Sequence, residues 1–254
     1  MSKNILIVTT NQRVFPGGKA SSGVWLSTIA RFARVLETNK YSYTFISPQG
    51  GEVQIDKHSL TWMFAKKDDW EYYKNEIFRD KLLHTLSPKQ INPQNYDAIY
   101  FSGGYGTLED FPDNQDFQDI SKTIYENGGV IAGVAHGVSG LLNIRLKNDA
   151  YLLNNKQVTG FTDLEETLAG NRKYMPFSLE NELKKRGAIF KKAILPYALF
   201  LVSDRQVITG QSPCASGAIA KEMIRKLHNI TDSLKDAQKV LIQDNSKTLR
   251  PGCR

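Results

Sequence analysis

Short apolar runs bounded by turn residues constrain the fold of this chain more than any other feature of its sequence. Four of them have the length and bias of buried strands: residues 5–9, 43–47, 98–101 and 130–134. Between them, residues 24–37 and 117–127 carry apolar side chains at close to the helical period. Strands that alternate with helices indicate β-α-β units, so we predict a flavodoxin-like α/β fold with a parallel sheet sandwiched by helices.

The composition of the remaining segments indicates an insertion, a last helix and a C-terminal tail. Residues 62–93 are rich in Lys, Asp, Asn and aromatic residues and lack strand character, so we expect a largely helical insertion over the sheet edge that shapes access to a site. A further helix is expected from 216 to about 228. Residues 1–230 are predicted to form a single domain, and residues 231–254 a tail with one short amphipathic helix.

The segments that follow two of the strands carry the most information about function. Ligands of parallel sheets bind beyond the carboxyl ends of the strands. Gly103-Gly104-Tyr105 follows one strand, and Ala135-His136 follows another. A strand that turns abruptly into a helix presents its turn residue at the sheet edge, as in the nucleophile elbow of acyl-transfer enzymes. We therefore predict a nucleophile elbow, a strand-turn-helix, at residues 130–142.

Several segments together resemble the ThiJ/PfpI superfamily, which has a class I glutamine amidotransferase-like fold. They are residues 22–25, 56–60, 103–107, 110–112, 124–132, 158–163, 180–187 and 207–213. The resemblance extends to about residue 227 and is closest to the branch of heat-shock chaperones and glyoxalase III. It implies a Cys–His–acid site with the cysteine at the elbow, a glutamate from the first helix beside that cysteine, and a homodimer.

Part of this site is present. The histidine matches His136, and the acid that would orient it matches Glu166, with Asp163 and Glu165 as nearby substitutes. A thiolate is a good nucleophile only when a neighbouring base or positive charge lowers its pKa, which is the role the resemblance assigns to such groups. The backbone of Gly103 and Gly104 would border the same site.

Three positions depart from the family pattern. Ala135 stands at the cysteine position, Thr28 at the position of the first-helix glutamate, and Tyr105 at the histidine of the Gly-Gly-His-Gly turn. Ala135 is either a substitution made to inactivate an enzyme or the result of natural divergence. Departures that cluster in one site favour divergence, and on either account the chain lacks cysteine chemistry at this elbow.

Replacement nucleophiles are poorly supported. Ser139 lies a full turn beyond the elbow, and the sequence places no base for it or for Ser102. Cys214 is expected to be a small, partly buried side chain. The spacing of Cys214 and Cys253 resembles no zinc motif, and we predict neither a metal nor a cofactor.

Three hypotheses for function follow. The first is a non-catalytic or weakly catalytic family member that keeps a small pocket for ligand binding or a stress or chaperone role. The second is a glyoxalase III-like hydratase/lyase that converts methylglyoxal to lactate, or a related hydrolase or deglycase, without its cysteine. There, His136 would be the general base, and N–H groups near Gly104 and His136 would hold the oxyanion. The partner in that case is a small carbonyl compound.

The third and weakest hypothesis is a nucleic-acid-associated protein, because the net charge is +7 and the pI about 9.2. The densest basic cluster, residues 184–192, follows Glu180 and Glu182 and lacks the repeated aromatic-basic interleaving that stacks bases, so a solvated helix face is favoured over nucleic acid as a partner. No apolar run approaches the ~20 residues of a membrane span, and residues 5–8 are typical of a first strand rather than a signal peptide. We therefore expect no membrane partner and a cytoplasmic location.

Overall fold

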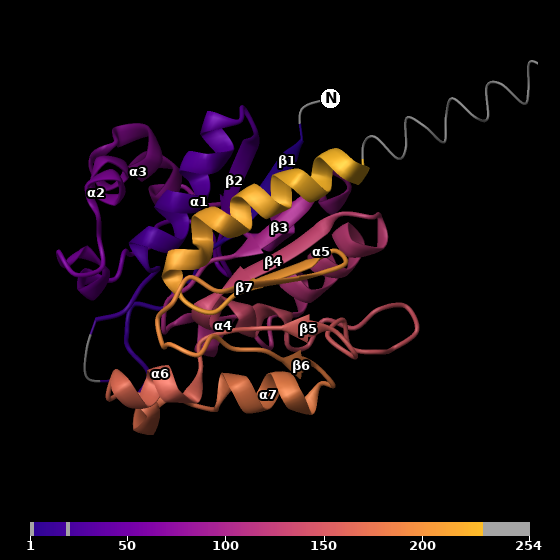
Figure 1. Cartoon of the computed structure of the whole chain (residues 1–254). Coiled ribbons are helices and arrows are strands. Elements are labelled where there is room, and N and C mark those ends of the chain that lie inside the picture. The colour runs from indigo at the N-terminus through magenta and orange to yellow at the C-terminus, as the bar shows by residue number, and fades with distance from the viewer. Residues whose placement is uncertain (1–2, 19–20, 231–254) are drawn as a thin grey trace, which may run out of the picture.

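The computed structural model describes residues 3–18 and 21–230, and a six-stranded sheet lies at its centre (Figure 1). The strand order is β2-β1-β3-β4-β8-β7. All neighbouring strands are parallel except β7 and β8, which are antiparallel. The strands are β1 (Asn4–Val8), β2 (Ser42–Ile46), β3 (Ala98–Phe101), β4 (Val130–Val134), β7 (Leu201–Asp204) and β8 (Val207–Gly210). The predicted parallel α/β sheet is confirmed, with one antiparallel strand at its edge.

Each face of the sheet carries its own apolar core, because side chains alternate along a strand. Ile5 and Ile7 of β1 pack in the cluster under α1 (Leu26–Thr38) and the helix of residues 216–230. Leu6 and Val8 pack in the opposite cluster with α5 (Gln115–Glu126). The sheet is thus covered by helices on both faces (Figure 1).

The insertion at 62–93 is helical, as expected, and lies beside the edge strand β2. It contains α2 (Lys67–Lys74), α3 (Glu76–Leu83) and one short 3-10 turn (Pro88–Gln90), and a second such turn (Pro93–Asn95) begins where it ends. Phe78 of α3 packs edge-on against Phe45 of β2, with ring centroids 5.6 Å apart. The buried carboxylate of Asp69 in α2 pairs with Arg31 of α1 at 2.7 Å, which joins the insertion to the first helix.

The remaining elements follow β3 and the elbow along the chain. They are α4 (Thr107–Asp110), α6 (Asp163–Leu168), α7 (Leu179–Lys185) and a second, two-stranded sheet of β5 (Gln157–Val158) and β6 (Ile189–Phe190). In the part of the chain that the structure describes, no helix combines the length and apolar character needed to cross a bilayer. The tail predicted at 231–254, with Cys253, lies outside the described residues.

Candidate functional site at the elbow

The chain turns sharply after β4. Ala135 has a φ of 50°, in the left-handed region that side chains other than glycine rarely adopt, at a strain of about 1 kcal/mol or more. A 3-10 helix, Ala135–Leu141, follows at once. At Gly137 an added Cβ would lie 2.1 Å from the carbonyl oxygen of Ser102, so only glycine lets the turn pass this close to the end of β3. The strand-turn-helix predicted at 130–142 is confirmed, with a 3-10 helix after the turn.

His136 forms a buried pair with Glu166 of α6. The Nε2 atom of His136 lies 2.5 Å from Oε1 of Glu166, and the two residues are 4% and 7% exposed. The second carboxylate oxygen of Glu166, Oε2, is buried and has no hydrogen-bond partner among the described residues. A carboxylate that accepts a hydrogen bond from imidazole fixes the orientation of the ring. The pair is therefore an oriented acid–base group beside the turn.

The two neighbouring carboxylates serve other purposes. Glu165 is fully buried and accepts hydrogen bonds from the backbone N–H and hydroxyl of Thr162, from the backbone N–H of Tyr197 and from the side-chain amide of Gln211. Asp163 accepts a hydrogen bond from Ser178 and pairs with Arg172 at 3.0 Å. Of the three candidate acids, Glu166 is the one that bonds to His136 within the described part of the chain.

Aromatic rings lie on both sides of His136. Its ring centroid is 4.5 Å from that of Tyr105 and 4.5 Å from that of Phe161. The Tyr105 hydroxyl accepts a hydrogen bond from Asn171 at 2.8 Å, and Phe15 packs on the same ring at 4.6 Å. Burial, and then the charge of Glu166, raise the pKa of Tyr105, so its phenol stays protonated at neutral pH. Tyr105 thus acts as one wall of the site.

Thr28 and Ala135 meet at Gly103. The Thr28 hydroxyl donates to the carbonyl oxygen of Trp25 at 2.6 Å and accepts from the Gly103 N–H at 3.2 Å. A Cβ added at Gly103 would lie 3.1 Å from Cγ2 of Thr28 and 3.4 Å from Cβ of Ala135. Where the resemblance implies a thiol and a carboxylate, the structure therefore has two methyl groups and a hydroxyl that already has partners. Gly104 follows with a φ of 145° and passes so close to Gly23 that an added Cβ would lie 2.4 Å from its carbonyl oxygen.

The alternative nucleophiles are occupied elsewhere. The hydroxyl of Ser139 donates to the carbonyl of Thr107 at 2.9 Å, and that of Ser102 donates to the carbonyl of Val8 at 2.7 Å. Cys214 is half-buried, with Sγ 3.0 Å from the hydroxyl of Ser212. Among the described residues, no three or more His, Cys, Asp or Glu side chains are grouped so that they could hold a metal ion.

Phe161 is a site residue that the sequence argument did not single out. It follows β5 and reaches His136 through the fold, so no local pattern marks it. Phe161 could have been found from the sequence only through its position in the segment 158–163, which is one of the segments that resemble the family. Thr28, Gly103, Gly104, Tyr105, Ala135, His136 and Glu166 form one continuous cluster with it, which we call the elbow site.

Comparisons with known proteins agree with this arrangement. Residues 22–226 match the model of the DJ-1/PfpI family. The chain is 31% identical to "Glutathione-independent glyoxalase HSP31" of Saccharomyces cerevisiae, over 89% of this chain and 98% of that protein. Its structure is similar to that of the Rapid Encystment Protein 24 KDa of Francisella tularensis (TM-score 0.84, 31% identity, 89% of this chain and 99% of that one). It is also similar to glyoxalase III from Candida albicans (TM-score 0.82, 27% identity, 88% and 97%). These findings confirm the family resemblance inferred from the sequence.

Proposed function

Since the chain belongs to the DJ-1/PfpI family, we propose that it is a glyoxalase III-type protein whose elbow site binds small carbonyl compounds but does not convert them through a thiol. One observation carries the proposal: the oriented His136–Glu166 pair stands directly beside an elbow residue, Ala135, that has no nucleophilic atom. Several similar proteins are named glyoxalases, and this supports a site derived from a glyoxalase rather than from an enzyme of unrelated chemistry.

The chemistry of a 2-oxoaldehyde explains what is lost and what is kept. A thiol at the elbow would add to the aldehyde carbon and form a thiohemiacetal, and a base would then move a proton from that carbon to its neighbour. The methyl group of Ala135 cannot begin this sequence. His136 and the N–H groups of the turn still provide hydrogen bonds to a carbonyl oxygen, so binding remains as the function of the site.

Methylglyoxal turnover tests the catalytic half of the proposal. We expect no lactate from the wild-type protein and little from Ala135→Cys, because Thr28 offers no carboxylate beside a new thiol. The double variant Ala135→Cys/Thr28→Glu should gain turnover, and adding His136→Ala should remove that gain. His136-dependent turnover restored by Ala135→Cys alone would instead support the second hypothesis, a glyoxalase that lacks only its cysteine, and turnover by the wild-type protein would contradict the proposal.

Binding is tested with hydroxyacetone, a small carbonyl compound that cannot undergo the aldehyde reaction. Titration of the wild-type protein should shift the imidazole resonances of His136, and Glu166→Gln should weaken the binding. A matched titration with propane, which lacks a polar group, controls for filling of apolar space. Absence of any shift with hydroxyacetone at millimolar concentration would contradict the binding half.

Three further expectations stay proposals. The homodimer is tested by analytical ultracentrifugation, the chaperone role by suppression of client aggregation on heating, and the cytoplasmic location by imaging of the tagged chain. Against nucleic-acid binding, Lys184 and Lys192 share Glu180 as an ion-pair partner and Lys185 pairs with Glu182, which favours a solvated face of α7. Salt-sensitive DNA binding would revive that hypothesis.

A further inference from the structure

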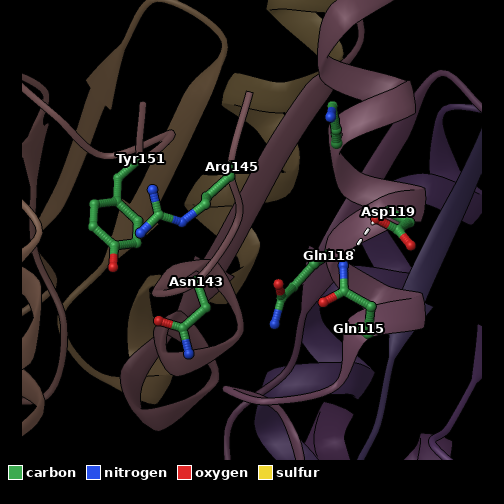
Figure 2. Close-up of a pocket in the computed structure, with 7 residues that line it drawn as sticks. Gln115, Gln118, Asp119, Asn143, Arg145 and Tyr151 are labelled. Carbon is green, nitrogen blue, oxygen red and sulfur yellow. Dashed lines mark hydrogen bonds between the residues drawn. The ribbon is translucent and has the colours of Figure 1, made fainter. Parts of the chain in front are cut away.

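A polar cavity of about 270 Å³ opens between α5 and the loop that follows the 3-10 helix of the elbow. Its lining consists of Gln115, Gln118, Asp119, Lys122, Asn143, Arg145 and Tyr151. In Figure 2 the side chains from α5 face those of Asn143, Arg145 and Tyr151 across the opening. No residue of the elbow site belongs to this lining, so the cavity is a separate feature that the proposed function does not use.

The helical wall of the cavity arises from the period of α5. Residues 115, 118, 119 and 122 are spaced at i, i+3, i+4 and i+7, which places them on one face of the helix. The opposite face of α5 buries Phe117, Ile120 and Ile124 against the sheet. The polar face is therefore turned away from the core and held in place by it.

The loop wall is fixed by its own contacts. Arg145 and Tyr151 form an isolated antiparallel bridge, and the guanidinium of Arg145 lies 4.2 Å from the centroid of the Tyr151 ring. The amide of Asn143 donates to the carbonyl of Pro112 and accepts two hydrogen bonds from Arg186. A site whose walls are held before binding loses little conformational entropy when a ligand enters.

The polar groups left over define the ligand. In the described part of the chain, Lys122 makes no ion pair, and Arg145 contacts Asp149 through Nη1 alone. Gln118 and Gln115 use their amide nitrogens on Pro112 and Asp119, which leaves their carbonyl oxygens as acceptors. The cavity thus offers cationic donors together with neutral acceptors that match hydroxyl groups.

The charge of the lining selects among anions. Lys122 and Arg145 contribute two positive charges to the lining and Asp119 one negative charge, and Asp149, which pairs with Arg145 at 3.3 Å, adds a second carboxylate beside it. With two carboxylates this close, a phosphate dianion would meet about twice the repulsion that a monocarboxylate meets. We propose that this cavity binds a small polyhydroxylated monocarboxylate, a sugar acid in its chemistry, with the carboxylate at Lys122 and Arg145 and hydroxyl groups at the glutamine carbonyls.

The test uses the full-length, isotope-labelled protein and gluconate as the probe. We expect saturable shifts of the side-chain amide resonances of Gln115, Gln118 and Asn143. Lys122→Gln and Arg145→Gln should each raise the Kd about tenfold, as expected for loss of one charge-assisted contact. The control is Lys147→Gln, because Lys147 is a nearby lysine that pairs with Glu126 and does not line the cavity.

Two further probes decide the ligand class. Sorbitol has a similar hydroxylated chain without the carboxylate and should bind at least tenfold more weakly than gluconate. Glucose 6-phosphate tests the dianion: tighter binding than gluconate would overturn the assignment to a monocarboxylate. An absence of shifts at the three amides with gluconate would overturn the site itself. Variants of the elbow site should leave all of these results unchanged, so the two proposals fail separately.

Discussion

The carboxyl group of Asp110 predicts an unusual pH dependence of stability. Asp110 ends α4, and its Oδ2 accepts hydrogen bonds from the hydroxyl of Thr10 at 2.7 Å and from the N–H of Asn11 at 2.9 Å. Its Oδ1 is buried and has no hydrogen-bond partner among the described residues. Burial raises the pKa of Asp110 from 3.8 to about 7, against the smaller opposing effect of these hydrogen bonds.

The sign follows from proton linkage. Because the pKa is higher in the folded state, the folded protein binds this proton more tightly than the unfolded chain does. The proton therefore stabilises the fold fully below pH ~4, and this contribution is lost as the pH rises toward and through 7. With pKa values of 3.8 and about 7, Asp110 alone lowers the free energy of unfolding by about 2 to 3 kcal/mol between pH 5 and pH 8.

Urea denaturation at pH 5 and pH 8 measures this effect, with wild type and Asp110→Asn compared. Asparagine cannot ionise, so the variant should lose about 2 kcal/mol less than wild type over the same interval. Its absolute stability is not the readout, because a buried amide N–H without an acceptor is destabilising at every pH. The control is Asp116→Asn on the exposed surface of α5, which should follow the wild-type profile. Parallel profiles for Asp110→Asn and wild type would refute the reasoning.

Three other substitutions test the backbone and packing of the site. Gly137→Ala should lower the free energy of unfolding by about 3 kcal/mol or more in urea denaturation, because its Cβ would clash at 2.1 Å with the carbonyl oxygen of Ser102, just after β3. Ala135→Gly should be neutral or stabilising by up to about 1 kcal/mol, since it relieves a positive φ, whereas the matched Ala132→Gly in β4 should be destabilising. Glu165→Leu should destabilise the fold by about 3 kcal/mol, because it leaves the donors from Thr162, Tyr197 and Gln211 unpaired; a loss below 1 kcal/mol would contradict the bracing role.

The sequence predicts four strands of the central sheet and misses β7 and β8. β8 is fully buried, but Thr209 and Gly210 leave only Val207 and Ile208 as an apolar run, which is too short to mark a strand. Every residue of β3 and β4 is buried, so each appears as a short continuous apolar run, and the predicted ends agree with the structure. The edge strand β7 is partly exposed and contains Ser203 and Asp204. Both residue types are common in turns, so the segment has no recognisable strand pattern. β5 and β6 have two residues each, too few for any periodic signal.

The same limit applies to the sites. His136 and Glu166 were predicted from a family pattern along the chain, and the structure brings them into contact. Phe161 and Phe15 reach the elbow site only through the tertiary fold. The cavity beside α5 combines an ordinary polar helix face with a loop that begins about 20 residues later, and neither part has a motif of its own. Spatial convergence of this kind is invisible to periodicity and spacing.

The three departures from the family pattern fit one another physically. Thr28 is fully buried, and a carboxylate there without a thiol partner would be a buried charge with nothing to stabilise it. The threonine hydroxyl instead has partners in the carbonyl of Trp25 and the N–H of Gly103, and its methyl group approaches the same glycine as Ala135. A single substitution of an elbow cysteine would leave the surrounding groups arranged for a thiol, whereas here the surroundings match an alanine. This mutual fit supports natural divergence of the whole elbow site, and it is the reason that restoring turnover should require Thr28 to change together with Ala135.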